Sequence, residues 1–454
     1  MTIYVSNTLR VIEPSDDLLR WAKKELILVN PDYLKKARMG FWMGNTPATI
    51  QLYEKRGNVL IIPFGTLKDL PLEVLKEAEI KFDFPVPKTI LYAADVPLYD
   101  YQSNAVDAMI ESGFGILQAP AGSGKTQIGI ALATRLSKRA LWLCHTKDLV
   151  NQSKKRAMQY IDKSLIGTIT EGKVDIGEGI TFATVQTMCN LDLPQYRDIW
   201  DVVIVDECHR VAGSPTTVTR YQKVLNALAA RHKYGLSATV HRSDGLIRTT
   251  YALLGQVVYR VLDNEVADKI MKVGIKAVNT NIGISRNCLN PDGTLNFAKM
   301  INYLAANEER NRLIVNLIEF RPSLILSDRL EHLNQLISML PKDMQDLSVM
   351  ISGKSKKADR EQALDDMRCG KKMFLFATYS LAKEGLDVPC LERLYMATPQ
   401  KDYAVVAQSV GRIARRYDGK LEAIAYDFVD NIGWQQRAFK KRCTTYRKIG
   451  CYFI

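Results

Sequence analysis

A glycine-rich stretch carries the residue types that hold phosphate groups. Residues 119–126 read Ala-Pro-Ala-Gly-Ser-Gly-Lys-Thr and follow an apolar run that predicts a buried strand at 114–118. Glycines let backbone N–H groups approach phosphates, and the N-terminus of the helix expected next adds partial positive charge. Lys125 can reach the β- and γ-phosphates, and the Thr126 hydroxyl can hold Mg²⁺. The nucleotide-binding candidates are Ala119, where the strict pattern has glycine, with Gly122, Ser123, Gly124, Lys125 and Thr126.

A second candidate is an apolar run that ends in two acids, Asp206 and Glu207. In parallel sheets, ligands bind beyond the carboxyl ends of the strands. There Asp206 can bind Mg²⁺ through water, and Glu207 can polarise an attacking water molecule. Such a pair is often only a solvated strand end. Because a phosphate-binding turn precedes it by about eighty residues, we predict phosphoryl transfer instead.

Polar residues end three further strands of the same region. Ser237 and Thr239 flank an alanine at a strand end, where they could couple nucleotide to substrate or could form an ordinary turn or cap. The hydroxyl and backbone groups of two other strand ends suit the phosphates of a nucleic acid, with helix capping as an equal alternative. These candidates are Thr146, Thr184 and Gln186.

Two arginines in the C-terminal third could act on the same nucleotide. Arg412 and Arg415 are three residues apart, so on a helix they would share a face and could reach a γ-phosphate as arginine fingers. The alternative is a plain basic helix face. Gly353 and Lys354 follow another strand, where a phosphate could sit. The Gly-Lys-Ser run there lacks the upstream glycines of a second nucleotide site.

Short apolar strands alternate with helical stretches, which predicts an α/β fold with two parallel-sheet units in tandem. Residues 1–95 form a small α+β accessory domain in this interpretation, residues 96–262 and 311–454 form the two α/β domains, and residues 263–310 form a polar, irregular connector. The expected strands are 114–118, 140–145, 180–184, 201–206 and 234–238, then 323–327, 347–351, 373–377, 393–397 and 422–428.

The first 95 residues contain an aromatic pair beside basic residues. Phe41 and Trp42 follow Lys35, Lys36 and Arg38. Aromatic rings can stack on unpaired bases while cations hold phosphates. Burial of both rings in the core of the small domain is an equally good interpretation. Helices are expected near 18–26 and 32–39, and a hairpin is expected from strands 49–53 and 58–63.

The charge balance favours a polyanionic partner. Lys plus Arg number 62 against 49 Asp plus Glu, a net charge of +13, which is typical of nucleic-acid binding but also found in merely soluble basic proteins. Eight cysteines without a Cys-x-x-Cys pair predict reduced thiols in the cytoplasm and no structural metal. No stretch reads as a membrane span or an export signal.

Taken together, these motifs resemble superfamily 2 helicases, and within them the XPB-like and UvsW-like DNA helicases of repair systems and large tailed bacteriophages. The resemblance spans roughly residues 98–430. It implies two RecA-like domains that bind ATP. It also implies that Gln102 reads adenine and that Gly385, Asp387 and Gln408 lie near the nucleotide. Thr378 and Ser327 would contact the nucleic acid. Arg242-Ser243-Asp244 stands where the XPB branch carries Arg-Glu-Asp, which argues against a damage-repair role of the XPB kind.

The resulting hypothesis is an ATP-driven DNA helicase that moves on DNA and remodels branched DNA, such as forks, loops or four-way junctions. It would act in replication, recombination or repair, including branch migration, in the host cytoplasm if encoded by a bacteriophage. Three alternatives stay open: a translocase on duplex DNA without strand separation, an RNA helicase, and a nucleotide-gated DNA clamp that does not hydrolyse ATP.

Overall fold

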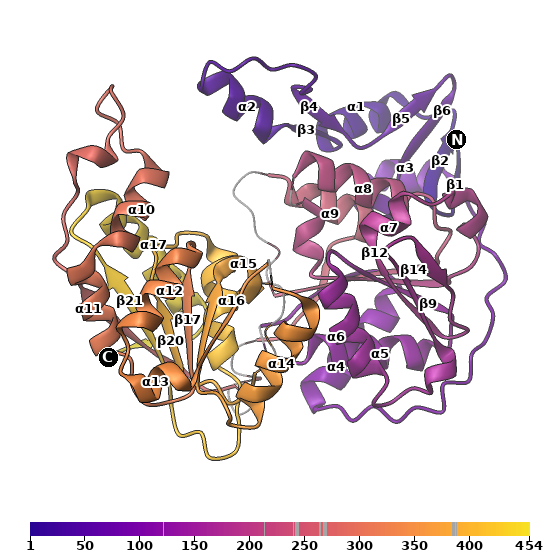
Figure 1. The fold of residues 1–454 in the computed structure, drawn as a ribbon. Coiled ribbons are helices and arrows are strands. Elements are labelled where there is room, and N and C mark those ends of the chain that lie inside the picture. The colour runs from indigo at the N-terminus through magenta and orange to yellow at the C-terminus, as the bar shows by residue number, and fades with distance from the viewer. Residues whose placement is uncertain are drawn as a thin grey trace. The chain divides into compact units, whose positions relative to one another are not determined.

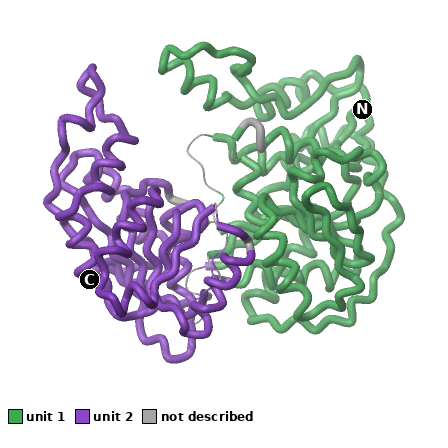
Figure 2. The backbone as a smooth tube through the Cα atoms, in the orientation of Figure 1, with its two compact units in different colours: residues 1–120, 124–261 green, residues 121–123, 262–454 purple. Residues whose placement is uncertain are grey.

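The computed structural model describes residues 1–454 except Ala121, Gly213, Thr239, 241–244, 263–264, 267–269, Lys354, 384–385 and Asp387. The chain divides into two compact units, which Figure 2 shows in different colours. Unit 1 comprises residues 1–120 and 124–261, and unit 2 comprises residues 121–123 and 262–454.

Unit 1 contains an eight-stranded sheet of order β11-β10-β12-β9-β13-β14-β8-β15, parallel except for the edge pair β10–β11. The strands are β8 (Gly115–Gln118), β9 (Ala140–Cys144), β10 (Ile166–Thr170), β11 (Lys173–Asp175), β12 (Ile180–Thr184), β13 (Val202–Asp206), β14 (His232–Ser237) and β15 (Val257–Arg260). All five strands that the sequence predicts here are present, whereas β10, β11 and β15 were not predicted.

Helices cover both faces of this sheet (Figure 1), because strands buried on both sides are apolar throughout. One group is α4 (Asp100–Ser112), α5 (Lys125–Leu136) and α6 (Lys147–Ala157). The other group is α7 (Val185–Cys189), α8 (Pro215–Leu225) and α9 (Ile247–Leu254).

The N-terminal residues form a five-stranded mixed sheet of order β5-β6-β2-β1-β7. Its elements are β1 (Thr2–Val5), β2 (Thr8–Ile12), α1 (Asp16–Glu25), β5 (Glu54–Arg56), β6 (Val59–Pro63), η1 (Phe64–Asp69), α3 (Leu72–Glu77) and β7 (Glu79–Phe82). A separate pair joins β3 (Ile27–Val29) to β4 (Thr49–Gln51), with α2 (Pro31–Arg38) between them. The predicted hairpin of 49–53 with 58–63 is therefore wrong, since β6 pairs with β5.

This small sheet shares one hydrophobic core with the rest of unit 1. The core combines side chains of β1, β2 and β6 with Phe114, Val218 and Ala252. Gly65 of η1 lies so close to the end of α9 that a Cβ atom there would come within 2.4 Å of the Gly255 nitrogen. The N-terminal residues are thus packed onto the first α/β sheet as part of the same body.

Unit 2 contains a seven-stranded parallel sheet of order β18-β19-β17-β20-β21-β16-β22. The strands are β16 (Val273–Asn279), β17 (Ser323–Ser327), β18 (Ser348–Ile351), β19 (Phe374–Thr378), β20 (Arg393–Met396), β21 (Ala423–Val429) and β22 (Tyr452–Phe453). The helices are α10 (Phe297–Ala306), α11 (Glu308–Asn316), α12 (Leu330–Met339), α13 (Lys342–Asp346), α14 (Lys357–Arg368), α15 (Tyr379–Lys383), α16 (Tyr403–Ile413) and α17 (Gly433–Lys448).

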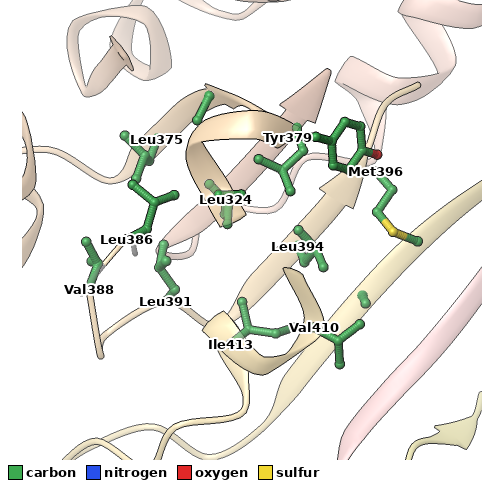
Figure 3. Packing of buried hydrophobic residues seen from close by; sticks show 14 of the residues in the cluster. Leu324, Leu375, Tyr379, Leu386, Val388, Leu391, Leu394, Met396, Val410 and Ile413 are labelled. Atoms are coloured by element: carbon green, nitrogen blue, oxygen red, sulfur yellow. The ribbon is translucent and has the colours of Figure 1, made fainter. Parts of the chain in front are cut away.

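Alternate residues of the central strands enter two cores on opposite faces of the unit 2 sheet. Leu324 and Leu375 pack with Val410 and Ile413 of α16 in one core (Figure 3), whereas Ile325 belongs to the other. The sheet and helices of unit 2 extend into residues 263–310, which the sequence predicts to be irregular. The prediction was wrong there, since β16 pairs with β21 along seven residues and α10 follows.

No helix among the described residues has the length and apolar character that crossing a lipid bilayer requires. All eight cysteines lie in the described part of the chain, and all are free thiols.

Candidate nucleotide and nucleic-acid site

The phosphate-binding candidate lies between β8 and α5, as the sequence predicts. Gly122 and Gly124 have φ angles of 86° and 78°, in the left-handed region that favours glycine. A Cβ atom on Gly124 would meet the Gln102 side-chain nitrogen at 2.4 Å. The ammonium group of Lys125 lies over the turn and donates to the carbonyl oxygens of Ala119 and Pro120, each at 3.1 Å. The turn is therefore closed by a positively charged side chain.

Gln102 is held beside this turn by the start of α4. Its side-chain oxygen accepts a hydrogen bond from the Tyr99 backbone N–H at 2.9 Å, and its side chain is buried. The amide nitrogen faces Gly124. The residue that resemblance connects to adenine thus adjoins the turn that the sequence connects to phosphate.

The acid pair lies at the carboxyl end of β13. Asp206 accepts hydrogen bonds from the Glu207 backbone N–H (2.9 Å) and from the Ser153 hydroxyl (3.3 Å). Glu207 has a φ of 48°, a conformation rare for residues other than glycine and typical of functional sites under strain. The two acids therefore have different, fixed surroundings.

These surroundings separate the acidities of the two carboxyl groups. Burial and the Glu207 carboxylate raise the pKa of Asp206, and the nearby Lys125 charge opposes the rise. Burial would also raise the pKa of Glu207, but the hydrogen bond and charge of His209 outweigh it, so the pKa of Glu207 is lowered. Glu207 is thereby kept ionised, as a group that orients water must be.

His209 connects the acid pair to the end of β14, a role that the sequence analysis did not assign. Its Nδ1 atom lies 3.2 Å from Glu207 Oε2 and 3.0 Å from the Ser237 hydroxyl. Ser237 is fully buried, and Thr239, the other coupling candidate, lies outside the described residues. The sequence signal for His209 was its place at the end of the run Asp206-Glu207-Cys208-His209. Only the parallel pairing of β13 with β14 brings this histidine to Ser237.

The two threonine candidates of unit 1 cap helices. The Thr146 hydroxyl accepts from Leu149 N–H at the start of α6, and the Thr184 hydroxyl accepts from Thr187 N–H at the start of α7, both at 3.4 Å. The alternative that the sequence left open, ordinary capping, is what both side chains do. Gln186 lies two residues after Thr184, and its buried side-chain oxygen has no hydrogen-bond partner among the described residues.

The arginine candidates of unit 2 are held differently from the expectation. Helix α16 ends at Ile413, so Arg415 lies beyond it, and the predicted shared helix face is wrong. Arg412 donates to the carbonyl oxygens of Ala382 and Leu386, both at 3.1 Å. Leu386 stands between Gly385 and Asp387, which both lie outside the described residues.

A buried lysine, absent from the sequence analysis, fixes the backbone after α16. Lys420 donates to the carbonyl oxygens of Leu391 (2.6 Å), Ile413 and Arg415 (2.9 Å). Its amine thereby supplies hydrogen bonds to carbonyl oxygens of the kind that the end of a helix leaves without donors. Lys420 therefore sets the path of the chain through Arg415.

The remaining unit 2 candidates lie at several strand ends and, for Gln408, in helix α16. Ser327 is fully buried and its hydroxyl bonds to His332 Nδ1 at 3.0 Å, so its side chain cannot contact a nucleic acid and that prediction is wrong. Thr378 is partly exposed and shares a hydrogen bond with the Ser380 hydroxyl. Gly353 is exposed at the end of β18, whereas Lys354 lies outside the described residues. Gln408 has a buried side-chain oxygen without a partner among the described residues.

The donor set of unit 1 fits Mg²⁺. Thr126 begins α5 beside Lys125, and Asp206 supplies a carboxylate, so both candidates are hard oxygen ligands. Mg²⁺ usually binds through one or two such groups together with water and substrate phosphates. Among the described residues, no group of three or more His, Cys, Asp or Glu could hold a metal ion, so the phosphates of a nucleotide would have to complete the coordination.

Comparison with known proteins agrees with this arrangement. Residues 95–242 match the family described as the res subunit of type III restriction enzymes, and residues 308–417 match the helicase conserved C-terminal domain. The two matches cover the segments that contain the phosphate turn with the acid pair and the arginine-bearing helix, and together they span more than half of the chain.

Two relatives extend over most of the sequence. The mimivirus protein named "Putative ATP-dependent RNA helicase L396" is 26% identical over 395 residues, 84% of this chain and 72% of its own length. The DNA 3'-5' translocase XPB2 of Sulfurisphaera tokodaii is 25% identical over 410 residues, 82% of this chain and 90% of its own length.

A solved structure shows the fold. Dbp5 of S. cerevisiae, bound to RNA and ADP BeF3, superposes with a TM-score of 0.54 at 16% identity, over 78% of this chain and 89% of that chain. Both α/β sheets of the present chain are RecA-like domains. With its phosphate turn, acid pair and second-domain arginine motif, the chain belongs to the superfamily 2 helicases, a family of ATP-dependent helicases and translocases.

Proposed function

We propose that this enzyme hydrolyses ATP to move along DNA and to remodel branched DNA, such as forks, loops and four-way junctions, in replication, recombination or repair. One observation carries the proposal: the nucleotide candidates of unit 1 form two groups of close contacts, one at the phosphate turn and one at the acid pair. Gln102 adjoins the turn of Lys125, and His209 joins Glu207 to Ser237. Such linkage is what a motor needs in order to couple nucleotide state to substrate.

Each nucleotide candidate has a defined task in this proposal. Gln102 contacts adenine, Lys125 and the backbone of the turn hold the phosphates, and Thr126 with Asp206 holds Mg²⁺. The metal ion would neutralise charge that develops on the phosphates. Glu207 orients the attacking water, since its carboxylate stays ionised beside His209. The protein thus contributes positioning and charge rather than a covalent intermediate.

The second domain contributes charge and grip in this proposal. Arg412 and Arg415 contact the γ-phosphate during turnover, and Gly385, Asp387 and Gln408 lie near the nucleotide. The partly exposed Thr378, with Gly353 and Lys354, holds the DNA backbone. Contacts to phosphate carry little sequence preference, so binding should weaken steeply as salt rises.

The aromatic pair of the N-terminal segment supports a DNA contact there. Trp42 is 89% exposed and Phe41 62% exposed, so neither belongs to the core. The preceding helix α2 has no buried residue and ends in Lys35, Lys36 and Arg38. Exposed rings beside cations can stack on bases that are unpaired at a junction. We therefore assign the preference for branched DNA to this segment.

We propose DNA as the substrate, and not RNA, because one of the two relatives described above is named a DNA translocase, although the other is named an RNA helicase. The basic charge suits both polymers. A test compares steady-state ATP hydrolysis without nucleic acid and with single-stranded DNA, duplex DNA, a four-way junction and RNA. We expect the greatest stimulation by the junction. Stimulation by RNA alone would reject the DNA assignment.

A Glu207→Gln variant tests the catalytic assignment. We expect ATP binding to persist and turnover to fall by about 10³-fold, because the ionised group that orients water is lost. The matched control is Glu178→Gln, a surface carboxylate that pairs with Lys88 and Arg139 and should leave turnover unchanged. Persistent turnover in Glu207→Gln would show that another residue orients the water.

A Phe41→Ala/Trp42→Ala variant tests the N-terminal segment. Truncation is a poorer test, because the N-terminal sheet shares its core with the first RecA-like domain. We expect the variant to lose the preference for the junction over plain duplex in ATPase stimulation. The exposed Phe320→Ala substitution in unit 2 serves as control. An unchanged preference in the double variant would remove this segment from DNA recognition.

The runner-up function is a translocase that moves on duplex DNA without separating its strands. A forked duplex with a labelled strand and a triplex with a labelled third strand distinguish the two. Displacement of the third strand without separation of the fork would favour the translocase. Binding of DNA with no turnover on any substrate would instead favour the clamp.

A further inference from the structure

The C-terminal helix α17 has a one-sided, strongly basic surface outside the helicase motifs. It covers residues Gly433–Lys448 and contains no acidic residue. At 100° per residue, its cations other than Arg442 fall within one third of the helix circumference, and each is exposed. We call this surface the α17 basic face; its members are Arg437, Lys440, Lys441, Arg447 and Lys448.

The opposite side of the helix anchors it to unit 2. Arg442 is buried and makes two hydrogen bonds to the Asp427 carboxylate of β21, at 2.7 and 2.8 Å. Tyr446 is also buried and donates to the same carboxylate at 2.7 Å. Figure 1 shows α17 beside β21 and α10. The position of the basic face is therefore determined by a firmly held helix.

Within unit 2, ion pairs do not neutralise the basic face. Arg437, Lys440, Lys441 and Lys448 have no acidic partner within salt-bridge distance among the described residues, and Arg447 lies over the Phe453 ring. Other surface helices differ. Arg312 of α11 pairs with Glu308, and Arg368 of α14 pairs with Asp365. The α17 basic face thus differs from these two helices.

Helix stability explains only part of this composition. Arg447 and Lys448 lie in the last turn, where cations interact favourably with the helix dipole. Arg437, Lys440 and Lys441 lie before that turn. Arg437 is spaced i,i+3 and i,i+4 from the two lysines, so like charges are neighbours and oppose helix formation. A polyanionic partner would turn this unfavourable arrangement into a favourable one.

We propose that the α17 basic face binds the phosphate backbone of DNA, as a contact of the second RecA-like domain that is separate from the helicase motifs. This inference rests on the proposed function, since it assumes that the motor acts on DNA. The face extends from residue 437 to residue 448, about 16 Å at the helical rise, which matches about five phosphates of one strand. Flexible lysines suit backbone contacts that must form and break as the motor moves.

An aromatic group continues this surface beyond the N-terminal end of the basic face. Trp434 of α17 packs edge-on against Phe297 of α10, with ring centroids 4.1 Å apart. Lys401 lies over both rings, at 5.4 and 5.7 Å. Lys401 is exposed, so it adds a sixth cation to the same side of unit 2.

The test neutralises three members of the face in the full chain, Arg437→Gln/Lys440→Gln/Lys441→Gln, and measures DNA affinity from 50 to 300 mM salt. Each lost phosphate contact should reduce the slope of log affinity against log salt by about one, so we expect a decrease of about two to three. Affinity at moderate salt should fall by about tenfold or more. Circular dichroism and the thermal midpoint check that the variant is folded.

A second variant with the same change in net charge is the matched control. Lys342→Gln/Lys371→Gln/Lys372→Gln removes cations that lie near Asp346 and Asp366. It should keep the wild-type salt slope. An unchanged slope in the α17 variant, or an equal decrease in both variants, would overturn the inference.

Two further measurements separate the possible failures. If wild-type ATP hydrolysis is not stimulated by DNA, the proposed function fails whatever α17 does. If DNA stimulates the wild type but the α17 variant loses only its binding to vesicles of acidic lipid, with DNA affinity intact, the basic face serves a membrane surface and the inference is rejected.

Discussion

The two RecA-like domains hold their nucleotide motifs by different means. In unit 1, Lys125 binds carbonyls of its own turn, but the residues that follow β13 contact side chains: Glu207 contacts His209, and His209 contacts Ser237. In unit 2, Arg412 and Lys420 bind backbone carbonyls instead. In a network of side chains, a shift in the position of one residue moves the next. A cation bound to backbone carbonyls instead stabilises the fold of its own domain. Arg412 therefore has a structural role beside the phosphate contact that we propose for it.

The largest expected effect concerns that double role. Arg412→Ala should lower kcat by about 10³-fold, as the loss of an arginine finger does. It should also lower the free energy of unfolding by about 1–3 kcal/mol, since carbonyls near Ala382 and Leu386 lose a charged donor. Steady-state kinetics and denaturant titration measure the two effects. Reduced stability with normal kcat would make Arg412 purely structural and leave Arg415 as the finger.

A smaller effect is expected from breaking the network of unit 1. His209→Ala removes the side chain that contacts both Glu207 and Ser237. If the network couples nucleotide to DNA, the ratio of DNA-stimulated to basal ATPase should fall by about tenfold, or about 1.4 kcal/mol of coupling. His232→Ala is the control, because that histidine lies at the other end of β14 and bonds to Gly113. A preserved ratio would show that the network only supports the fold.

The most gradual effect concerns two buried lysines, one in each unit. Burial lowers the pKa of Lys233 to about 7 and that of Lys420 to about 8. Above its folded pKa and up to its unfolded pKa near 10.5, each lysine binds a proton only in the unfolded chain. Stability should therefore rise with pH in that range, by at most about 1.4 kcal/mol per pH unit.

Denaturant titrations from pH 6 to 9.5 test this expectation. The difference in unfolding free energy between the wild type and Lys233→Met should grow from about pH 7, whereas for Lys420→Met it should grow from about pH 8. The exposed Lys342→Met substitution should give a constant difference. A constant difference for Lys233→Met would mean that this lysine remains charged in the folded protein.

Some strands of the two domains were predictable from the sequence, and others were not. The central strands of both sheets followed from apolar runs, because a parallel strand covered on both faces must be apolar throughout. Strand β16 escaped prediction because it lies near the sheet edge and carries the exposed Lys276 beside the buried Ile275. Its pairing with β21 joins residues about 150 positions apart, which local patterns cannot show.

Prediction of the candidate site succeeded and failed for related reasons. The turn with Lys125 and the pair Asp206 and Glu207 were predictable because local order and spacing define them. Ser327 was misjudged, since its burial depends on His332 of the following helix. Arg415 was misjudged because helix α16 ends at Ile413, two residues before it.

By itself, the sequence determined the family, the places of the nucleotide-binding candidates and the order of the two sheets, since these depend on residue types at short, regular spacing. Only the tertiary structure decided the exposure of Phe41 and Trp42, the link of His209 to Ser237 and the uncompensated charge of α17. Each depends on which surfaces are covered and which distant residues meet, and those are properties of packing rather than of local sequence.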